Sequence, residues 1–290
     1  MGINREERLR VFEDTEWTVR TVNRLKNAVA HSNENQKLIL ETDLVEAGNI
    51  DYKEEATIIV SKKRSFEAAG AYRDKKVCVL NFASATNPGG GVTKGASAQE
   101  ECLCRISTLY FNLNTKEMWD GFYGPHRAFR NTLHTDDIIY TPEVVVFKTD
   151  TDNPVIMKEE DWYTVDVITC AAPNLRNMPS NAYNSGDGDI AVKPTEKELY
   201  ALHVKRFTKI LQAAVANRAE AIILGAFGCG TFENDPKVVA QAAKDAIAPF
   251  LRSFETIEFA VYCTREHQEN YEIFRRVLHR TRENNENLVR

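Results

Sequence analysis

Short apolar segments recur along the chain, and several of them are apolar throughout instead of alternating with polar residues. They cover residues 56–60, 77–82, 138–147, 165–170, 221–226 and 257–263. A short run of this kind, rich in β-branched residues, is typical of a strand that is buried on both faces. The pattern therefore predicts strands of one sheet that is covered on both sides.

Longer segments with helical character lie before and between these strands. They cover residues 5–30, 61–72, 98–113, 196–217, 237–252 and 267–282. Two helix starts are clearly marked, by the capping box Thr195-Glu-Lys-Glu198 and by the pair Asp235-Pro236. Strands that alternate with helices predict an α/β protein with one mixed or parallel sheet. Such sheets bind ligands at the carboxyl ends of their strands.

Composition and charge narrow the class of protein. A chain of 290 residues, 43% hydrophobic and 27% charged, is typical of a soluble globular protein and fits a single domain over 1–290. The formal net charge of −5 argues against a broad nucleic-acid-binding surface. No segment has the length and apolar character of a signal peptide or a membrane span, so we expect a cytoplasmic protein that binds no membrane.

The six cysteines indicate neither disulfides nor a metal site. Most stand inside apolar segments, and none forms a C-x-x-C pair. We therefore expect reduced, mostly buried thiols and no zinc. By contrast, Asn, Ser, Gly and Asp crowd together between residues 176 and 189, where we expect a mobile surface loop.

The first segment with candidate chemistry is a glycine-rich loop, Asn87-Pro-Gly-Gly-Gly91, which follows a predicted strand. Consecutive glycines let backbone N–H groups approach a ligand closely, and the helix that follows adds its N-terminal dipole. A phosphate cradle and a plain flexible turn both fit this pattern. A P-loop does not, because Ala96 stands where that motif requires a lysine. We expect Gly90 to lie against ligand atoms with no room for a side chain.

Two carboxyl groups follow this loop, at Glu100 and Glu101. Ser97-x-x-Glu100 has the spacing of a capping box, so the Glu100 side chain has a structural interpretation as well as a functional one. Glu101 has no such local partner. The helix N-terminus would lower its pKa, whereas Glu100 and a bound diphosphate would raise it. A proton donor is therefore available here, although the sign of the net pKa shift stays open.

A second glycine-rich loop runs from the predicted strand at 221–226 towards Pro236 and contains Gly228-Cys-Gly-Thr-Phe232. Its glycine spacing is not the dinucleotide fingerprint, which makes a Rossmann dehydrogenase a poor fit. Two glycine loops at strand ends could instead clamp the two phosphates of one diphosphate. We expect Phe227 to pack in the core and Phe232 to contact the ligand.

Gly89-Gly-Gly91, a spacer of seven residues and then Gln99-Glu100-Glu101 resemble the signature of poly(ADP-ribose) glycohydrolases. The surrounding LNFASATNPGGG and GAFGCGTF resemble the microbial type of that family, and the resemblance extends over nearly the whole chain. It implies a three-layer α/β/α, macrodomain-like mixed sheet with additional N-terminal helices in about the first 50 residues. It also implies a monomer that needs no metal or cofactor.

The same resemblance implies a role for each motif residue. Glu101 would be the catalytic acid, Glu100 would hydrogen-bond ribose hydroxyls, and Gln99 would support the pair. The remaining expected substrate contacts are Asn87, Gly89, Gly90 and Gly91 at the reacting ribose, and Gly228, Cys229, Gly230, Thr231 and Phe232 at the diphosphate and nucleotide.

Three activities agree with these motifs. The first is chain-end hydrolysis of poly(ADP-ribose) to ADP-ribose. The second is hydrolysis of other ADP-ribosyl linkages, on protein or nucleic acid. The third is binding of ADP-ribose without catalysis. Only the first two need a proton donor at Glu101, and they share every motif. The partner is thus an ADP-ribose polymer or another ADP-ribosylated substrate.

Overall fold

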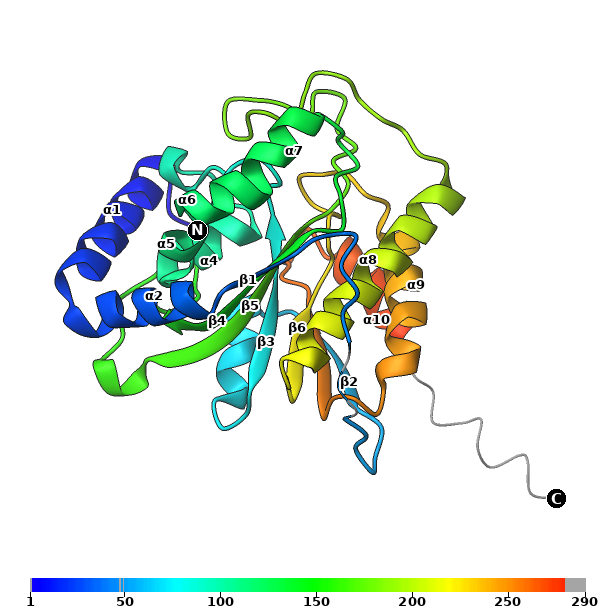
Figure 1. Ribbon diagram of the computed structural model, residues 1–290, viewed down its shortest axis with the longest axis horizontal. Helices are drawn as coiled ribbons and strands as arrows, with labels where there is room; N and C mark the ends of the chain where they lie inside the picture. The colour runs from blue at the N-terminus through cyan, green and yellow to red at the C-terminus, as the bar shows by residue number, and fades with distance from the viewer. Residues whose placement is uncertain (1, 47, 49, 280–290) are drawn as a thin grey trace.

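The computed structural model describes residues 2–46, 48 and 50–279. Within these residues one seven-stranded sheet has the order β1-β4-β5-β3-β6-β7-β2 (Figure 1). The strands are β1 (Lys37–Ile39), β2 (Thr57–Ser61), β3 (Val77–Ala83), β4 (Ile138–Val146), β5 (Tyr163–Ala171), β6 (Ala221–Leu224) and β7 (Thr256–Ala260). The pairs from β5 to β2 are parallel. At the other edge β4 runs antiparallel to β5, and β1 runs antiparallel to β4. The mixed sheet confirms the predicted class.

Helices cover both faces of this sheet (Figure 1). On one side lie α1 (Arg5–Thr21), α2 (Asn23–Asn35), α3 (Ser65–Ala69), α4 (Gln99–Ile106), α5 (Leu109–Leu113), α6 (Lys116–Met118) and α7 (Gly124–Phe129). On the other lie α8 (Glu196–Ala216), α9 (Pro236–Ile247) and α10 (Glu269–Leu278). Short helical turns are η1 (Gly70–Tyr72), η2 (Val92–Lys94), η3 (Trp119–Tyr123), η4 (Glu159–Asp161) and η5 (Ala248–Phe250). The result is a three-layer α/β/α arrangement.

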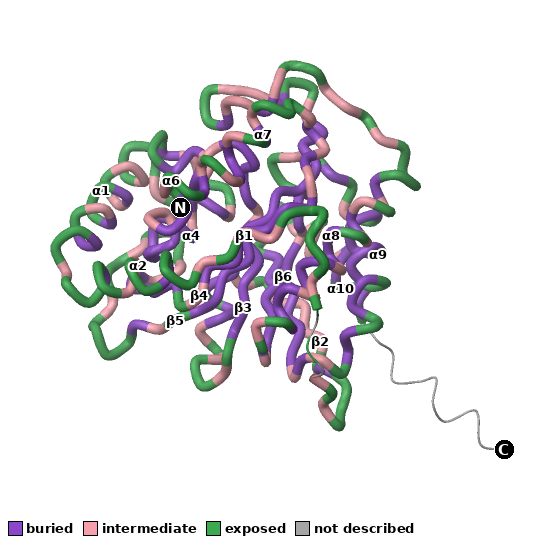
Figure 2. Tube along the Cα trace, viewed as in Figure 1, coloured by how far each residue is buried: buried purple, intermediate pink, exposed green. Residues whose placement is uncertain are grey.

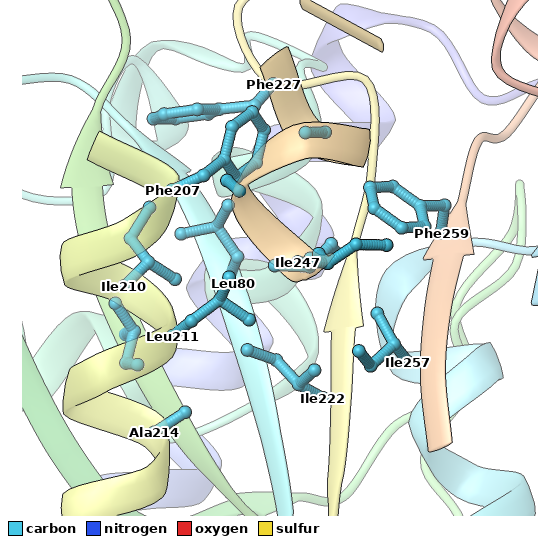
Figure 3. Packing of buried hydrophobic residues seen from close by; sticks show 14 of the residues in the cluster. Leu80, Phe207, Ile210, Leu211, Ala214, Ile222, Phe227, Ile247, Ile257 and Phe259 are labelled. Carbon is cyan, nitrogen blue, oxygen red and sulfur yellow. The ribbon is translucent and has the colours of Figure 1, made fainter. Parts of the chain in front are cut away.

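The two faces of the central strand bury alternate side chains, as the period of a strand requires. Leu80 of β3 packs with Phe207 and Ile210 of α8 in one core (Figure 3), whereas its neighbour Val79 belongs to the core on the opposite face. Both residues are almost fully buried, and most residues of β3, β4, β5, β6 and β7 are buried, whereas the edge strands β1 and β2 are partly exposed (Figure 2). The sheet is therefore covered on both sides, as its apolar strands indicate.

The structure differs from the sequence prediction mainly where helices break. The segment 5–30 is two helices, because Val22 takes an extended conformation (φ −84°, ψ 114°) while its N–H still caps α1 at the Thr18 carbonyl. The segment 98–113 is likewise divided, at Ser107 and Thr108. The first 50 residues also contribute β1, so this part is not only helical. The expected helix 267–282 ends at Leu278, and its last three residues lie outside the described part.

A buried ion pair joins α8 to the sheet. Arg206, 1% exposed, donates from Nε to Asp136 Oδ1 at 2.7 Å and from Nη1 to the Ala171 carbonyl at 2.7 Å. Burial alone would raise the pKa of Asp136, but Arg206 and Lys205 together lower it. Asp136 precedes β4 and Ala171 ends β5, so one guanidinium holds three elements together below the cavity described next.

This pair predicts a large loss of stability on substitution. Arg206→Met leaves Asp136 with Lys205 as its only cation and leaves buried carbonyls such as that of Ala171 without this donor, and we expect it to lower the free energy of unfolding by about 3–5 kcal/mol. Arg252→Met is the matched control, because Arg252 pairs with Asp51 where both side chains are exposed, and we expect a loss below about 1 kcal/mol. Urea unfolding followed by circular dichroism measures both. Equal losses would contradict this account.

Candidate active site

One large cavity, of about 1180 Å³, opens at the carboxyl ends of the parallel strands. Its walls come from the loop between β3 and α4, from the loop between β6 and α9, and from residues that follow β5 and β7. The predicted site residues in the wall are Gly90, Gly91, Gln99, Glu100, Glu101, Gly228, Gly230, Thr231 and Phe232. Asn87, Gly89 and Cys229 lie next to them in the chain and are not part of the wall. The two glycine loops thus meet at one cavity, as expected.

The first glycine loop closes tightly around the carboxyl pair. Gly89 and Gly90 have positive φ angles of 66° and 57°, in a region that L-residues rarely adopt. A Cβ on Gly90 would lie 2.5 Å from Glu101 Oε1 and 3.0 Å from Glu100 Oε2. The expectation that a side chain has no room here is confirmed. The atoms that exclude it are the two carboxyl groups, where the sequence analysis had placed ligand atoms.

Glu100 is 2% exposed and points towards the end of β3. Its Oε2 accepts the Ser84 N–H at 2.8 Å, and its Oε1 accepts from Asn81 Nδ2 at 3.2 Å. The proposed capping box with Ser97 is wrong, because the N-cap of α4 is Ala98 and no side chain caps it. Burial, and next the charge of Glu101, raise the pKa of Glu100 well above its usual range.

Glu101 is 7% exposed and lies under the glycine loop. Its Oε1 accepts the Gly91 N–H at 2.8 Å, whereas Oε2 is buried without a hydrogen-bond partner in the described structure. Burial raises the pKa of Glu101, and the Gly91 hydrogen bond opposes this only in part. The net pKa shift of Glu101, whose sign could not be predicted from the sequence, is therefore upward. One oxygen of this carboxyl thus has its hydrogen-bonding capacity unused by the described protein.

Gln99 fixes the start of α4 against β3. Its Oε1 accepts the Phe82 N–H at 2.9 Å, and its Nε2 donates to the Leu80 carbonyl at 2.9 Å. These are the backbone groups that a strand neighbour would otherwise satisfy. The amide therefore sets the position of the two carboxyl groups that follow it, which agrees with the supporting role implied for it.

The second glycine loop is held from below by Asn234, a residue that sequence reasoning missed. Asn234 Nδ2 donates to the carbonyls of Pro173 (2.7 Å), Gly228 (3.0 Å) and Phe232 (3.2 Å). Its Oδ1 lies 2.8 Å from Nε2 of His203. Burial lowers the pKa of His203 to about 4, so the ring is neutral, and Nε2 carries the proton that it donates to the amide.

The two phenylalanines of this loop differ in burial. Phe227 is fully buried and packs against Phe82 and Phe207, which confirms its place in the core. Phe232 is partly exposed, lines the cavity and lies 6.0 Å, between ring centroids, from His134. Its ring is therefore available to a ligand.

The loop expected to be a mobile surface segment is anchored in its middle. Asp187 is 2% exposed and accepts from Asn174 Nδ2 at 2.6 Å and from Thr86 Oγ1 at 3.0 Å. Asn184 accepts from Ser84 Oγ at 2.6 Å. Burial would raise the pKa of Asp187, but His134 and the amide and hydroxyl donors together lower it. The carboxylate is therefore a charged anchor.

Asn87 belongs to the same anchor. Its Nδ2 donates to the Ser185 carbonyl at 2.7 Å, and its Oδ1 accepts from Arg127 Nη2 at 2.6 Å. The side chain thus ties the first glycine loop to the segment around Asn184 and Asp187. Polar residues crowded in one loop are the only sequence signal for this network, and they indicate a turn as readily as an anchor.

Among the residues that the structure describes, no helix is both long and apolar enough to pass through a lipid bilayer. In the same part of the chain, no three His, Cys, Asp or Glu side chains gather as metal ligands would.

The chain is similar in fold and sequence to solved structures. The family described as the microbial-type PARG catalytic domain matches residues 6–149. The poly(ADP-ribose) glycohydrolase of Thermomonospora curvata is 30% identical, covering 94% of this chain and 99% of that one, with a TM-score of 0.81. The same enzyme bound to the inhibitor ADP-HPD is 29% identical, covering 93% of this chain and 99% of that one, with a TM-score of 0.79.

The poly(ADP-ribose) glycohydrolase of Deinococcus radiodurans, in complex with ADP-ribose, is 30% identical. The match covers 86% of this chain and 96% of that one, with a TM-score of 0.73. No curated protein gives a significant match. The structural likenesses confirm the macrodomain-like α/β/α fold that the motifs implied. The chain belongs to the microbial-type poly(ADP-ribose) glycohydrolases, a family of glycosidases.

Proposed function

We propose that this protein hydrolyses the ribose–ribose O-glycosidic bond of poly(ADP-ribose), releases ADP-ribose from the chain end and uses Glu101 as its general acid. The observation that carries this proposal is the free, buried Oε2 of Glu101 at the wall of a cavity that two glycine loops share. The Deinococcus relative holds ADP-ribose. A cavity of 1180 Å³ is large enough for a ligand of that size.

The two glycine loops would hold the two ends of the substrate. The segment 228–232 would hold the diphosphate, because at Gly230 nothing lies within 4 Å of a Cβ position, so the backbone faces open space. Phe232 would stack on the bound nucleotide. The loop at 89–91 lies against the carboxyl pair and would hold the reacting ribose. Asn87 and Gly89 would act by shaping this loop.

The hydrogen bonds support different roles for the two carboxyl groups. Both oxygens of Glu100 already accept protein N–H groups, which fixes the carboxyl at the end of β3. The remaining lone pairs of these oxygens would accept ribose hydroxyls. Glu101 has one oxygen without a hydrogen-bond partner. Burial raises the pKa of both groups, so the hydrogen bonds, and not the pKa values, support the acid role of Glu101. A carboxyl group with a raised pKa is an effective acid near neutral pH.

The reaction then follows from charge and position. Glu101 would protonate the departing ribose oxygen while the C–O bond breaks, and positive charge would develop on the remaining sugar. The diphosphate of the bound unit and the ionised Glu101 would stabilise this oxocarbenium-like state. Water would add to the anomeric carbon, and its proton would return to Glu101. Attack at the chain end predicts ADP-ribose, and no oligomers, as the first product.

The acid role predicts the order of two substitutions. Glu101→Gln keeps the shape but delivers no proton, so we expect a loss of roughly 10²–10⁴-fold in kcat with ADP-ribose affinity little changed. Glu100→Gln turns one amide N–H towards a protein donor and should cost less. Release of ADP-ribose from purified polymer measures both. Near wild-type turnover by Glu101→Gln would refute the mechanism.

The close contact between Gly90 and the Glu101 carboxyl predicts that a substitution at Gly90 also lowers turnover. A methyl group at Gly90 would push the Glu101 carboxyl aside, so Gly90→Ala should lower kcat at least about tenfold and cost about 1 kcal/mol through its positive φ. Gly70→Ala is the control, because a Cβ at Gly70 comes no closer than 3.5 Å to Tyr163. The measurements are polymer turnover and thermal unfolding. Equal activity of both variants would contradict this fit.

Binding is predicted independently of catalysis. ADP-ribose at about 100 times its Kd should stabilise the folded chain by about 2.7 kcal/mol and raise the Tm, because the ligand binds only the native state. ATP with magnesium at the same concentration should raise the Tm clearly less. Differential scanning fluorimetry gives both values. Equal shifts would count against a site built for ADP-ribose.

A further inference from the structure

The position of the acid determines where the departing part of the substrate must lie. If Glu101 is the general acid, as proposed above, the leaving oxygen sits within hydrogen-bond distance of its carboxyl. That carboxyl is covered by Gly91, whose N–H it accepts at 2.8 Å. The unit that leaves therefore has to pass the outer side of the glycine loop. The side chains at that point would contact the leaving group.

Tyr183 lies at this place. A Cβ on Gly91 would be 3.1 Å from Tyr183 Cβ and 3.2 Å from its carbonyl oxygen, so the two backbones touch. Tyr183 lines the same cavity as Glu101, yet it is 42% exposed. It belongs to the loop that crosses the top of the molecule before α8 (Figure 1).

The backbone of Tyr183 is held on both sides. Lys94 Nζ donates to the Ala182 carbonyl at 2.7 Å, and the Tyr183 N–H donates to Asn181 Oδ1 at 2.8 Å. The next residue, Asn184, is 8% exposed and accepts from Ser84 Oγ. An exposed ring on a fixed backbone loses little freedom when a flat ligand stacks on it.

The positively charged Arg5 lies beside the Tyr183 ring. The Arg5 guanidinium carbon lies 6.0 Å from the centroid of Tyr183, and Arg5 Nε donates to the Lys94 carbonyl at 2.9 Å. Arg8 of the same helix donates to the Gly95 carbonyl at 2.7 Å. The first helix thus places cations beside an exposed aromatic ring, outside the part of the cavity assigned to the bound unit.

We propose that Tyr183 and Arg5 form a binding site for the leaving unit of the polymer. The purine of that unit would stack on the Tyr183 ring, and Arg5 would attract its diphosphate. A small aglycone, such as an amino-acid side chain, has neither group. The site would therefore favour polymer over mono-ADP-ribosylated substrates, which the catalytic motifs alone do not distinguish.

The test compares two substrates that differ only in the leaving group. One is a short ADP-ribose oligomer, and the other is ADP-ribose joined through the same bond type to a small alkyl alcohol. We expect Tyr183→Ala to lower kcat/KM for the oligomer at least about fivefold and to leave the alkyl substrate and ADP-ribose affinity unchanged. Tyr183→Phe keeps the ring and should behave as the wild type. Trp17→Ala, which removes an exposed ring outside the cavity, is the control.

A binding measurement separates this site from the reaction. In the Glu101→Gln background, Tyr183→Ala should weaken binding of an ADP-ribose dimer but not of ADP-ribose. Arg5→Gln should weaken dimer binding and reduce its salt dependence. Equal losses on both substrates, or no loss on the oligomer, would overturn the leaving-unit site. If the wild type cleaves neither substrate but its dimer binding still depends on Tyr183, the proposed reaction fails and the binding site stands.

Discussion

The missing side chain at Gly90 is the constraint on which the site depends. The space that a Cβ would take is filled by the carboxyl oxygens of Glu100 and Glu101, 3.0 and 2.5 Å away. A glycine adopts φ 57° without strain, and because it has no Cβ its backbone can lie this close to two acidic groups. Two neighbouring side chains support this contact. Gln99 fixes the helix that carries the acids, and Asn87 fixes the loop that covers them.

Burial of the two carboxyl groups beside Gly90 lowers the free energy of unfolding near neutral pH. Burial of neighbouring carboxyl groups raises both pKa values, so the folded chain binds these protons more tightly than the unfolded chain does. By linkage, their contribution to stability is present at low pH and is lost as the pH rises through the folded-state pKa values. Near neutrality the pair therefore opposes folding. An active site that needs an acid with a high pKa therefore lowers the stability of the fold, and interactions elsewhere in the fold must offset this loss.

The two hydrophobic cores, one on each face of the sheet, offset the destabilising effect of the buried carboxyl pair. Leu80 and Val79 bury opposite faces of the central strand, and Arg206 joins α8 to the ends of the antiparallel and parallel parts of the sheet. These elements were largely predictable, because a strand buried on both faces shows a continuous apolar run. Phe227 was predictable for the same reason. The β1 strand, three residues long, and the break at Val22 were not, since neither Gly nor Pro marks them and packing decides both.

The site was predictable to a lesser extent. The glycine loops and the acidic pair stand out in the sequence because their chemistry is local, but their partners come from distant residues. Ser97 has the right spacing to cap Glu100, yet Ser84 and Asn81 bind that carboxyl, because the end of β3 is nearer in space. Asp187 and Asn234 carry no local signal, since a buried polar residue is defined by donors and acceptors from other segments.

These distant partners share one property that explains how a cavity can stay open and still be rigid. Asn234 holds three carbonyls around the second glycine loop, and Asp187 binds Asn174 and Thr86 beside the first. Backbone that borders a cavity lacks apolar packing on one side, so burial alone does not fix its shape. Directional hydrogen bonds from buried amides and carboxylates supply the missing constraint. The loops can therefore present their outer faces to a ligand while their inner faces remain fixed.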